Sequence, residues 1–155
     1  MTAKSEKRRT LEDLLAEPFV LRASVESSVV RALQAQLPPI IPADYFEMFR
    51  LGNGGAGDVG GGDYAEFWSI DELESNNQEY EVFQYAPGLI LFGSSGGGEA
   101  FAFDTTQKGV TIGIVPFIGM CVEEYCPIAE TFLAFLNEVA AGLNYDEILA
   151  VGSRQ

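Results

Sequence analysis

Histidine is absent from this sequence of 155 residues, and cysteine occurs only at Cys121 and Cys126. Without histidine the usual general base is missing, which excludes Ser-His and Cys-His nucleophilic catalysis. Two thiolates are too few for a tetrahedral zinc site, which takes four nitrogen or sulfur ligands. The sequence therefore predicts no metal and no cofactor. We expect the two cysteines to be reduced, with a disulfide or redox pair as the alternative.

Basic residues are also scarce, because 9 Lys and Arg stand against 23 Asp and Glu, giving a net charge of −14. Nucleic acids and anionic lipid surfaces attract Lys and Arg, so this balance argues against nucleic acid and membrane as partners. Some of the basic residues cluster ahead of any core-like pattern, at Lys4, Lys7, Arg8 and Arg9. We interpret this cluster as a solvated tail.

No apolar run in the sequence is long enough to cross a membrane. The longest stretch of low charge, residues 109–122, is too short and contains Pro116, so it is typical of a buried strand. Behind the basic N-terminus, Glu12, Asp13 and Glu17 stand where an export signal needs an uninterrupted apolar stretch. We therefore expect a cytoplasmic protein.

A hairpin pattern over residues 87–105 is the centre of what the sequence does contain. Residues 89–92 are a continuous apolar run, which is typical of a strand buried on both faces. Residues 93–98 are only Gly and Ser, which suits a wide or bulged turn. Glu99, Phe101 and Phe103 then alternate with Ala100, Ala102 and Asp104, as in a returning strand.

Helical patterns precede this hairpin. Thr10 and Asp13 form a capping pattern for a short helix that ends near Pro18. A second helix is predicted over residues 24–37, because apolar residues that should face the core recur every four positions at Val25, Val29, Leu33 and Leu37. A third helix follows Pro42 and ends at residues 52–55, Gly-Asn-Gly-Gly, in the left-handed conformation.

Residues 54–63 are glycine-rich and contain Asp58 and Asp63. A phosphate-binding loop would need a following Lys-Ser/Thr pair, and the Asp spacing fits no EF-hand, so we interpret the segment as a surface loop available to a partner. A strand over residues 64–70 and a helix over residues 70–85 come next, and Ser69 with Glu72 forms a capping box for that helix.

The pattern after the hairpin predicts a strand over residues 110–118, a helix over residues 129–142 and a short helix over residues 145–151. In the strand, Val110, Ile112 and Ile114 share one face. Strands in the middle with helices at both ends predict a single α+β domain. Its central sheet is antiparallel or mixed and is flanked by N-terminal and C-terminal helices.

Several segments, in their order and spacing, resemble the SUKH superfamily: residues 42–49, 53–55, 67–73, 87–93, 97–104 and 130–136. This superfamily includes the Smi/Knr cell-wall-assembly regulators of fungi and many bacterial immunity proteins. The match runs over residues 24–142, so we expect a SUKH-like domain at residues 24–151. Residues 1–23 would be an extension with the basic tail and the short helix. The sequence departs from the family at Ser95, where an Asp is common.

The resemblance implies a non-catalytic module that binds another protein. The bacterial members are similar to immunity proteins, which bind and neutralise a cognate toxin, often a nuclease, inside the cell that makes it, and we expect this function here. The charge is compatible, because a nuclease presents positive charge on which an acidic protein can dock. Solubility is the other explanation of the acidity. A regulatory scaffold and a carboxylate-based hydrolase are the alternative functions.

As partner-binding residues we expect acidic side chains in loops and near strand ends: Asp58, Asp63, Glu66, Glu99 and Asp104. Tyr64 and Trp68 are candidate aromatic anchors. For Trp68 a core position is the stronger interpretation, and for Asp104 a turn with Thr105 and Thr106. No catalytic residue is predicted, and the sequence does not indicate an oligomeric state.

Overall fold

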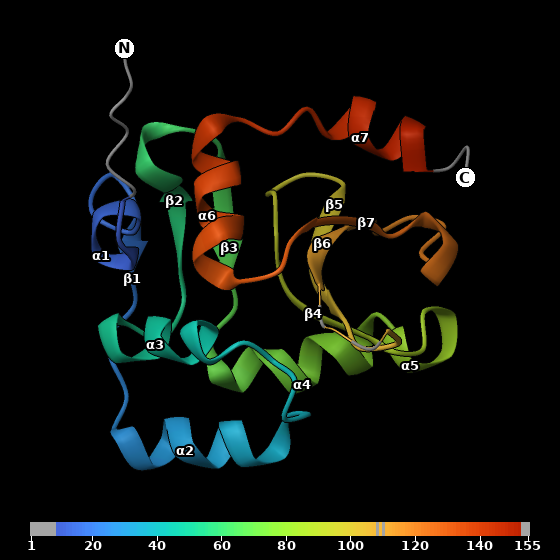
Figure 1. Cartoon of the computed structure of the whole chain (residues 1–155). Helices are drawn as coiled ribbons and strands as arrows, with labels where there is room; N and C mark the ends of the chain where they lie inside the picture. The colour runs from blue at the N-terminus through green and yellow to red at the C-terminus, as the bar shows by residue number, and fades with distance from the viewer. Residues whose placement is uncertain (1–8, 108, 110, 153–155) are drawn as a thin grey trace.

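A seven-stranded sheet, with its strands side by side in the order of the chain, forms the centre of the structure (Figure 1). The computed structural model describes residues 9–107, 109 and 111–152. The strands are β1 (Val20–Leu21), β2 (Gly55–Asp58), β3 (Tyr64–Phe67), β4 (Leu89–Ser94), β5 (Glu99–Asp104), β6 (Thr111–Pro116) and β7 (Cys126–Ala129). All neighbouring pairs are antiparallel, so the predicted α+β class is confirmed with an antiparallel sheet.

The described residues form helices at both ends of the chain and between strands. They are α1 (Leu11–Leu14), α2 (Ser27–Gln36), α3 (Ala43–Leu51), α4 (Ile70–Glu79), α5 (Val82–Tyr85), α6 (Phe132–Ala141) and α7 (Tyr145–Gly152). Two short 3-10 turns are η2 (Val59–Gly61) and η3 (Val122–Glu124). In Figure 1, α6 lies in front of β3, α2 and α3 lie below the sheet, and α7 lies above it.

An aromatic core fills the space between α3, α6 and one face of the sheet. Tyr45 of α3 is fully buried, and its ring centroid lies 5.0–5.5 Å from those of Phe46, Phe49, Phe92, Phe103 and Phe132. Such edge-to-face pairs stabilise by about 0.5–1.5 kcal/mol beyond the burial of their area. These contacts therefore hold both helices against β4 and β5.

The N-terminus of α6 is held by a residue far away in the chain. Both oxygens of the Asp44 carboxylate accept hydrogen bonds from the first turn of α6, from Phe132 N at 3.1 Å and from Leu133 N at 2.8 Å. Thr131 adds a local cap by accepting from Ala134 N. A carboxylate at this position also interacts favourably with the helix dipole. Asp44 thus fixes α6 to α3.

Burial differs between the middle of the sheet and β2–β3. Almost all residues of β4, β5 and β6 are buried or nearly so, which confirms that this hairpin region is buried on both faces. In β3, by contrast, Ala65 and Phe67 are buried, whereas Tyr64 is exposed and Glu66 is half-buried. On the side away from α6, the sheet is therefore open over β2 and β3.

The glycine-rich segment 54–63, which the sequence indicated to be a surface loop, instead forms the strand β2, paired between β1 and β3, followed by the 3-10 turn η2. The sequence pattern failed because this strand contains glycine where strands usually have β-branched or aromatic residues. A Cβ atom at Gly55 would collide with the carbonyl oxygen of Val20 in β1. Glycine is therefore what allows β1 and β2 to pair so closely.

Three helix expectations are also corrected. Val29 is 41% exposed, and Val30 takes its place in the core with Leu33, because a spacing of four residues drifts around a helix of 3.6 residues per turn. The single helix expected over residues 70–85 is divided into α4 and α5 at Glu81, whose φ is 54°. After α3, Gly52 is extended, with φ −179°, and the left-handed residue is Gly54.

The sequence also missed β7. Residues 126–129 pair with β6, so α6 begins at Phe132 rather than at Ala129.

The segment before residue 24 packs into the same core as the rest of the domain. Leu14, Leu15 and Phe19 are at most 2% exposed, and β1 pairs with β2. The predicted capping box of Thr10 and Asp13 is confirmed. The expectations for Lys4, Lys7, Arg8 and Val110 fall outside the described residues. None of the described helices has the length and apolar character needed to cross a membrane.

Candidate functional site

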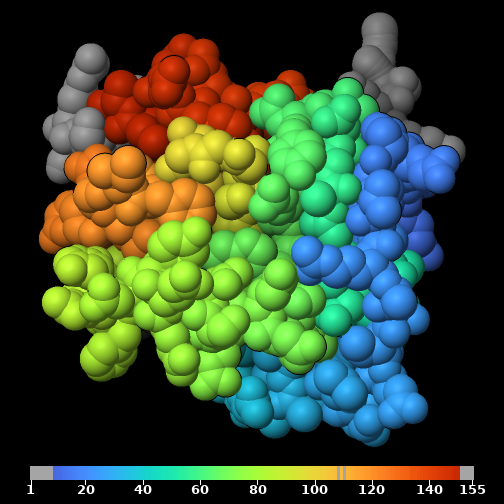
Figure 2. Space-filling model, turned by 180° about the vertical axis from the view of Figure 1, so that it is seen from behind, coloured from blue at the N-terminus to red at the C-terminus, as the bar shows by residue number. Residues whose placement is uncertain are grey.

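A groove with a volume of about 720 Å³ lies on the open side of β2 and β3. Its walls are the glycine-rich β4–β5 turn, the C-terminal end of α4 and the segment after β6. Figure 2 views this side of the molecule, where the green, yellow, orange and lime segments meet around a recess. We call it the open-face groove and define it by Glu66, Trp68, Tyr80, Gly98 and Phe117.

Three aromatic rings from different segments form a ladder along this groove. The centroids of Trp68 and Tyr80 lie 6.3 Å apart with planes at 11°, and those of Tyr80 and Phe117 lie 4.8 Å apart. Tyr80 is 43% exposed, and Ile118, the next residue after Phe117, is 93% exposed. Tyrosine and tryptophan side chains are enriched in protein-binding hot spots.

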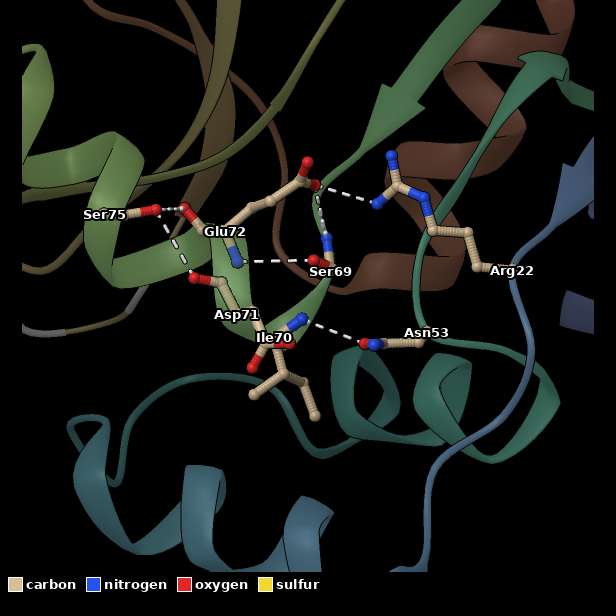
Figure 3. A network of polar contacts seen from close by, with 7 residues as sticks. All are labelled: Arg22, Asn53, Ser69, Ile70, Asp71, Glu72 and Ser75. Atoms are coloured by element: carbon tan, nitrogen blue, oxygen red, sulfur yellow. Dashed lines mark hydrogen bonds and ion pairs between the residues drawn. The ribbon is translucent and has the colours of Figure 1, made fainter.

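A polar network fixes the N-terminus of α4 at one end of the groove (Figure 3). Ser69 Oγ accepts from Glu72 N at 3.3 Å, and Glu72 Oε1 accepts from Ser69 N at 3.0 Å. The predicted capping box is therefore confirmed. Asn53 Oδ1 accepts from Ile70 N at 2.9 Å, so the residue that follows α3 and Gly52 also caps α4. This bond locks α3 and α4 together beneath the groove.

Arg22 joins the same network from the segment after β1. Its Nη1 atom donates to Glu72 Oε1 at 2.8 Å. Burial acts to raise the pKa of Glu72. The hydrogen bonds from Ser69 and Arg22, together with the positive charge of Arg22, outweigh this effect and hold the pKa below its ordinary value. Glu72 is therefore an ionised structural residue, and the positive charge of Arg22 is already compensated.

Asp58, Tyr64 and Glu66, three of the residues expected to bind a partner, lie together on the groove side of the sheet. The register places Asp58 opposite Tyr64, and directly opposed residues share a face. Tyr64 Oη donates to Glu66 Oε2 at 3.1 Å. Desolvation, this bond and the two nearby carboxylates raise the pKa of Tyr64. Within the described residues, neither carboxylate has a cation within salt-bridge distance.

Asp63 and Glu99 lie on the opposite side, beside the loop between α6 and α7. Asp63 Oδ2 accepts from Leu143 N at 2.7 Å, and Glu99 Oε1 accepts from Ser95 Oγ at 2.7 Å. Burial raises the pKa of Tyr145, and the charges of Asp63 and Glu99 add to this effect, so the three groups are close. Asp63 therefore shapes a loop, and neither residue joins the groove-side cluster.

Asp104 lies in a turn and Trp68 is largely buried, as the alternative interpretations of these two residues predicted. Asp104 is 6% exposed at the end of β5, and its Oδ1 accepts from both the backbone N and the hydroxyl of Thr106. It shapes the turn to β6 at the far end of the sheet. Trp68 is 7% exposed, yet it lines the groove, because it forms the inner end of the aromatic ladder.

Sequence reasoning missed the groove residues that come from other segments. Tyr80 falls within the helix expected over residues 70–85 and Phe117 within the strand expected over residues 110–118, and the sequence predicts no role for Arg22. No local signal in the sequence marks these residues, because Trp68, Tyr80 and Phe117 come together only in the fold. Across the part of the chain that the structure describes, no three His, Cys, Asp or Glu side chains are grouped to hold a metal ion.

An antiparallel sheet in chain order, packed by α3 and α6 on one face and open over β2 and β3 on the other, defines a single-sheet α+β domain. Residues 25–138 match the model of the SMI1 / KNR4 family (SUKH-1), and the chain belongs to this family. The resemblance indicated by the sequence motifs is therefore confirmed. The comparison with curated proteins gives no match.

Proposed function

We propose that this protein is a non-catalytic binding module that holds a basic protein partner on its groove side. We propose further that the partner is a toxin domain, of nuclease type, which it neutralises as an immunity protein. Its family supports a binding role of this kind. The observation that carries the proposal is the position of Glu66, which lines the groove together with the aromatic ladder. Within the described residues its carboxylate has no cation within salt-bridge distance, and neither has that of Asp58, which lies opposite Tyr64 further along the same face.

The charges of the protein suit a basic partner. The arginines of the described residues already have acceptors inside the protein: Arg9 with Gly60 O, Arg22 with Glu72, Arg31 with Ser27 and Arg50 with Glu47. The chain as a whole carries a net charge of −14. Such a field steers a basic partner towards the surface and speeds association, more strongly at low salt.

A carboxylate-based hydrolase has less support. Its general acid must have a raised pKa, so that it carries a proton at the working pH. Glu72, which lines the groove, has a lowered pKa and is held by Ser69 and Arg22. Glu72 is therefore unsuited to that role.

One observation favours a regulatory scaffold as the second candidate. A separate hollow of about 900 Å³ lies between α2, α4 and α5, next to Phe83, which is 91% exposed. Two separate surfaces would allow more than one partner to bind at once. The number of partners recovered therefore distinguishes the two functions.

The test is capture from the source cells with the tagged full-length chain as bait, at low and high salt, followed by co-expression of the captured protein with this chain in a growth assay. We expect one basic polypeptide that binds at low salt, is released at high salt and is toxic unless this chain is present. Several unrelated partners, none of them toxic, would favour the scaffold instead.

Two pairs of variants distinguish an effect of the groove side from an effect of the net charge of the protein. Asp58→Lys with Glu66→Lys should slow association with the basic partner and abolish neutralisation. Glu130→Lys with Glu138→Lys makes the same change of charge at two exposed positions, one just before α6 and one in its last turn, and should retain neutralisation. If both pairs behave alike, the acidic groove side is not the binding surface.

A further inference from the structure

We propose that the open-face groove takes an extended, arginine-bearing loop of the partner protein. One guanidinium group of that loop stacks on the rings of Tyr80 and Phe117 and pairs with the carboxylate of Glu66. This inference rests on the proposed function, because it names the chemistry of the segment that the partner inserts. It is carried by the aromatic ladder, by the uncompensated charge and by the open glycine turn.

The ladder provides a stacking surface for a cation. Trp68 is 7% exposed and contacts the ring of Tyr80, whereas Tyr80 is 43% exposed and Phe117, at the outer end of the ladder, is half-buried. The faces of aromatic rings carry negative potential and attract cations. A guanidinium group is planar and more weakly hydrated than an ammonium group, so it stacks on such rings more readily than lysine does.

The groove already holds one guanidinium group and leaves a second carboxylate uncompensated. At one end, Arg22 Nη1 lies 2.8 Å from Glu72 Oε1. Glu66 lines the same groove and accepts a hydrogen bond from Tyr64 Oη. A carboxylate has about four acceptor positions, so Glu66 can also accept from a guanidinium group of the partner. A purely apolar segment would bury this charge without a counter-ion, which is costly.

The glycine turn leaves space for the backbone of the partner. Gly98 lines the groove and has no left-handed φ, and a Cβ atom there would meet nothing within 4 Å. The fold itself therefore does not require glycine at this position. Because Gly98 has no side chain to project into the groove, the backbone of another protein can approach closely there.

The fluorescence of Trp68, the single tryptophan of the sequence, reports on this groove in the full-length protein. The probes are the peptides acetyl-Arg-Gly-Arg-Gly-Arg-amide and acetyl-Lys-Gly-Lys-Gly-Lys-amide, which carry equal charge. We expect the arginine peptide to change the emission of Trp68 and to bind about two- to fivefold more tightly than the lysine peptide. Equal affinities, or binding without any response of Trp68, would overturn the proposal.

Blocking variants test the location. Gly98→Phe should weaken binding of the arginine peptide at least about tenfold, because its ring occupies the groove. Gly109→Phe is the matched control, since a Cβ atom at Gly109 also meets nothing, and this glycine lies in the turn between β5 and β6. Circular dichroism checks that both variants fold. Equal binding by the two variants would place the site elsewhere.

Tyr80→Leu should remove the preference for arginine over lysine, because it keeps apolar area but loses the ring. Tyr85→Leu makes the same change on α5, where the side chain is 52% exposed, and should keep the preference. A preference that survives in Tyr80→Leu would refute stacking on the ladder.

The outcomes also separate this inference from the proposed function. If a neutralised basic toxin binds wild type and Gly98→Phe equally, the groove proposal fails while the proposed function stands. If the arginine peptide behaves as expected but the captured partners are neither basic nor toxic, the proposed function fails and the groove chemistry stands.

Discussion

The two sides of the sheet use aromatic residues in opposite ways. Towards α3 and α6, Tyr45 is enclosed by phenylalanine rings and is fully buried. On the groove side, Trp68 is covered, but Tyr80 keeps 43% of its surface exposed. Rings of the first kind contribute to stability, whereas rings of the second kind remain available to a partner. Aromatic content alone therefore does not distinguish a core from a binding surface.

The largest effect should come from a truncation in the enclosed cluster. Phe92 is completely buried and lies 4.5 Å from Phe103 between ring centroids. Phe92→Ala should lower the free energy of unfolding by about 3–5 kcal/mol, since it removes a buried ring and leaves a cavity. Phe117→Ala, at the partly exposed end of the ladder, should cost roughly 1 kcal/mol. Urea denaturation measures both, and equal losses would remove the contrast between the two sides.

A smaller loss is expected where α4 meets the sheet. The Asn77 side chain accepts from Leu91 N and donates to Leu91 O, both at 2.9 Å, beside the bulge in β4. Asn77→Ala would leave both backbone groups without these partners, so it should lower stability by about 2 kcal/mol. Gln78→Ala, at the exposed neighbouring position, should stay within about 0.5 kcal/mol. Similar melting temperatures for the two variants would contradict this role of Asn77.

A gain in stability is expected inside the enclosed cluster. The hydroxyl of Tyr45 is buried without a hydrogen-bond partner, and burial raises its pKa far above the ordinary value. Tyr45→Phe should therefore raise the free energy of unfolding by about 1 kcal/mol, because it removes an unsatisfied polar group. The control is Tyr125→Phe, which loses the 2.9 Å hydrogen bond with Thr111 and should be destabilised. A loss of stability in Tyr45→Phe would mean that its hydroxyl is satisfied in solution.

The smallest effect depends on pH and lies at the end of the groove. The folded-state pKa of Glu72 is below its ordinary value of 4.5, so its stabilising contribution is present above that pH and is lost as the pH falls through the lower value. Glu72→Gln should be less stable than wild type by about 0.5–1 kcal/mol at neutral pH, since both partners are partly exposed. Denaturation in acid, once the pH is below the lowered pKa, should show no difference between the two. A difference that persists in acid would contradict the ionic origin.

Elements with local signals could be predicted from the sequence, and elements that depend on distant contacts could not. Ser69 and Glu72 predict the start of α4, because their capping box is contained in four consecutive residues. Asp44 gives no such signal for α6, because its partners are 88 and 89 residues away. Likewise, the sequence of β2 is typical of a loop. Its glycines are explained only by the neighbouring strand β1, because a Cβ atom at Gly55 would collide with Val20 O.

The same reasoning applies to the candidate site. Tyr64 and Glu66 could be placed on one face in advance, since they are two residues apart in an expected strand. Asp58 joins them only because β2, which the sequence indicated to be a loop, pairs with β3. Tyr80 and Phe117 meet Trp68 only because α4 and the segment after β6 converge on the end of β3. Asn77 illustrates the same point, because its side chain ties α4 to β4 through Leu91, which is 14 residues away.

The order of the strands has a consequence for how the chain folds. Each strand lies beside the one that precedes it, so β4, β5 and β6 pair through short connections. Sheets with such neighbouring contacts close small loops first and fold faster than those built from distant pairings. We expect this central hairpin set to form early, even on a chain still leaving the ribosome. The docking of α6 onto Asp44, which must wait for residue 132, would then be the late step that completes the domain.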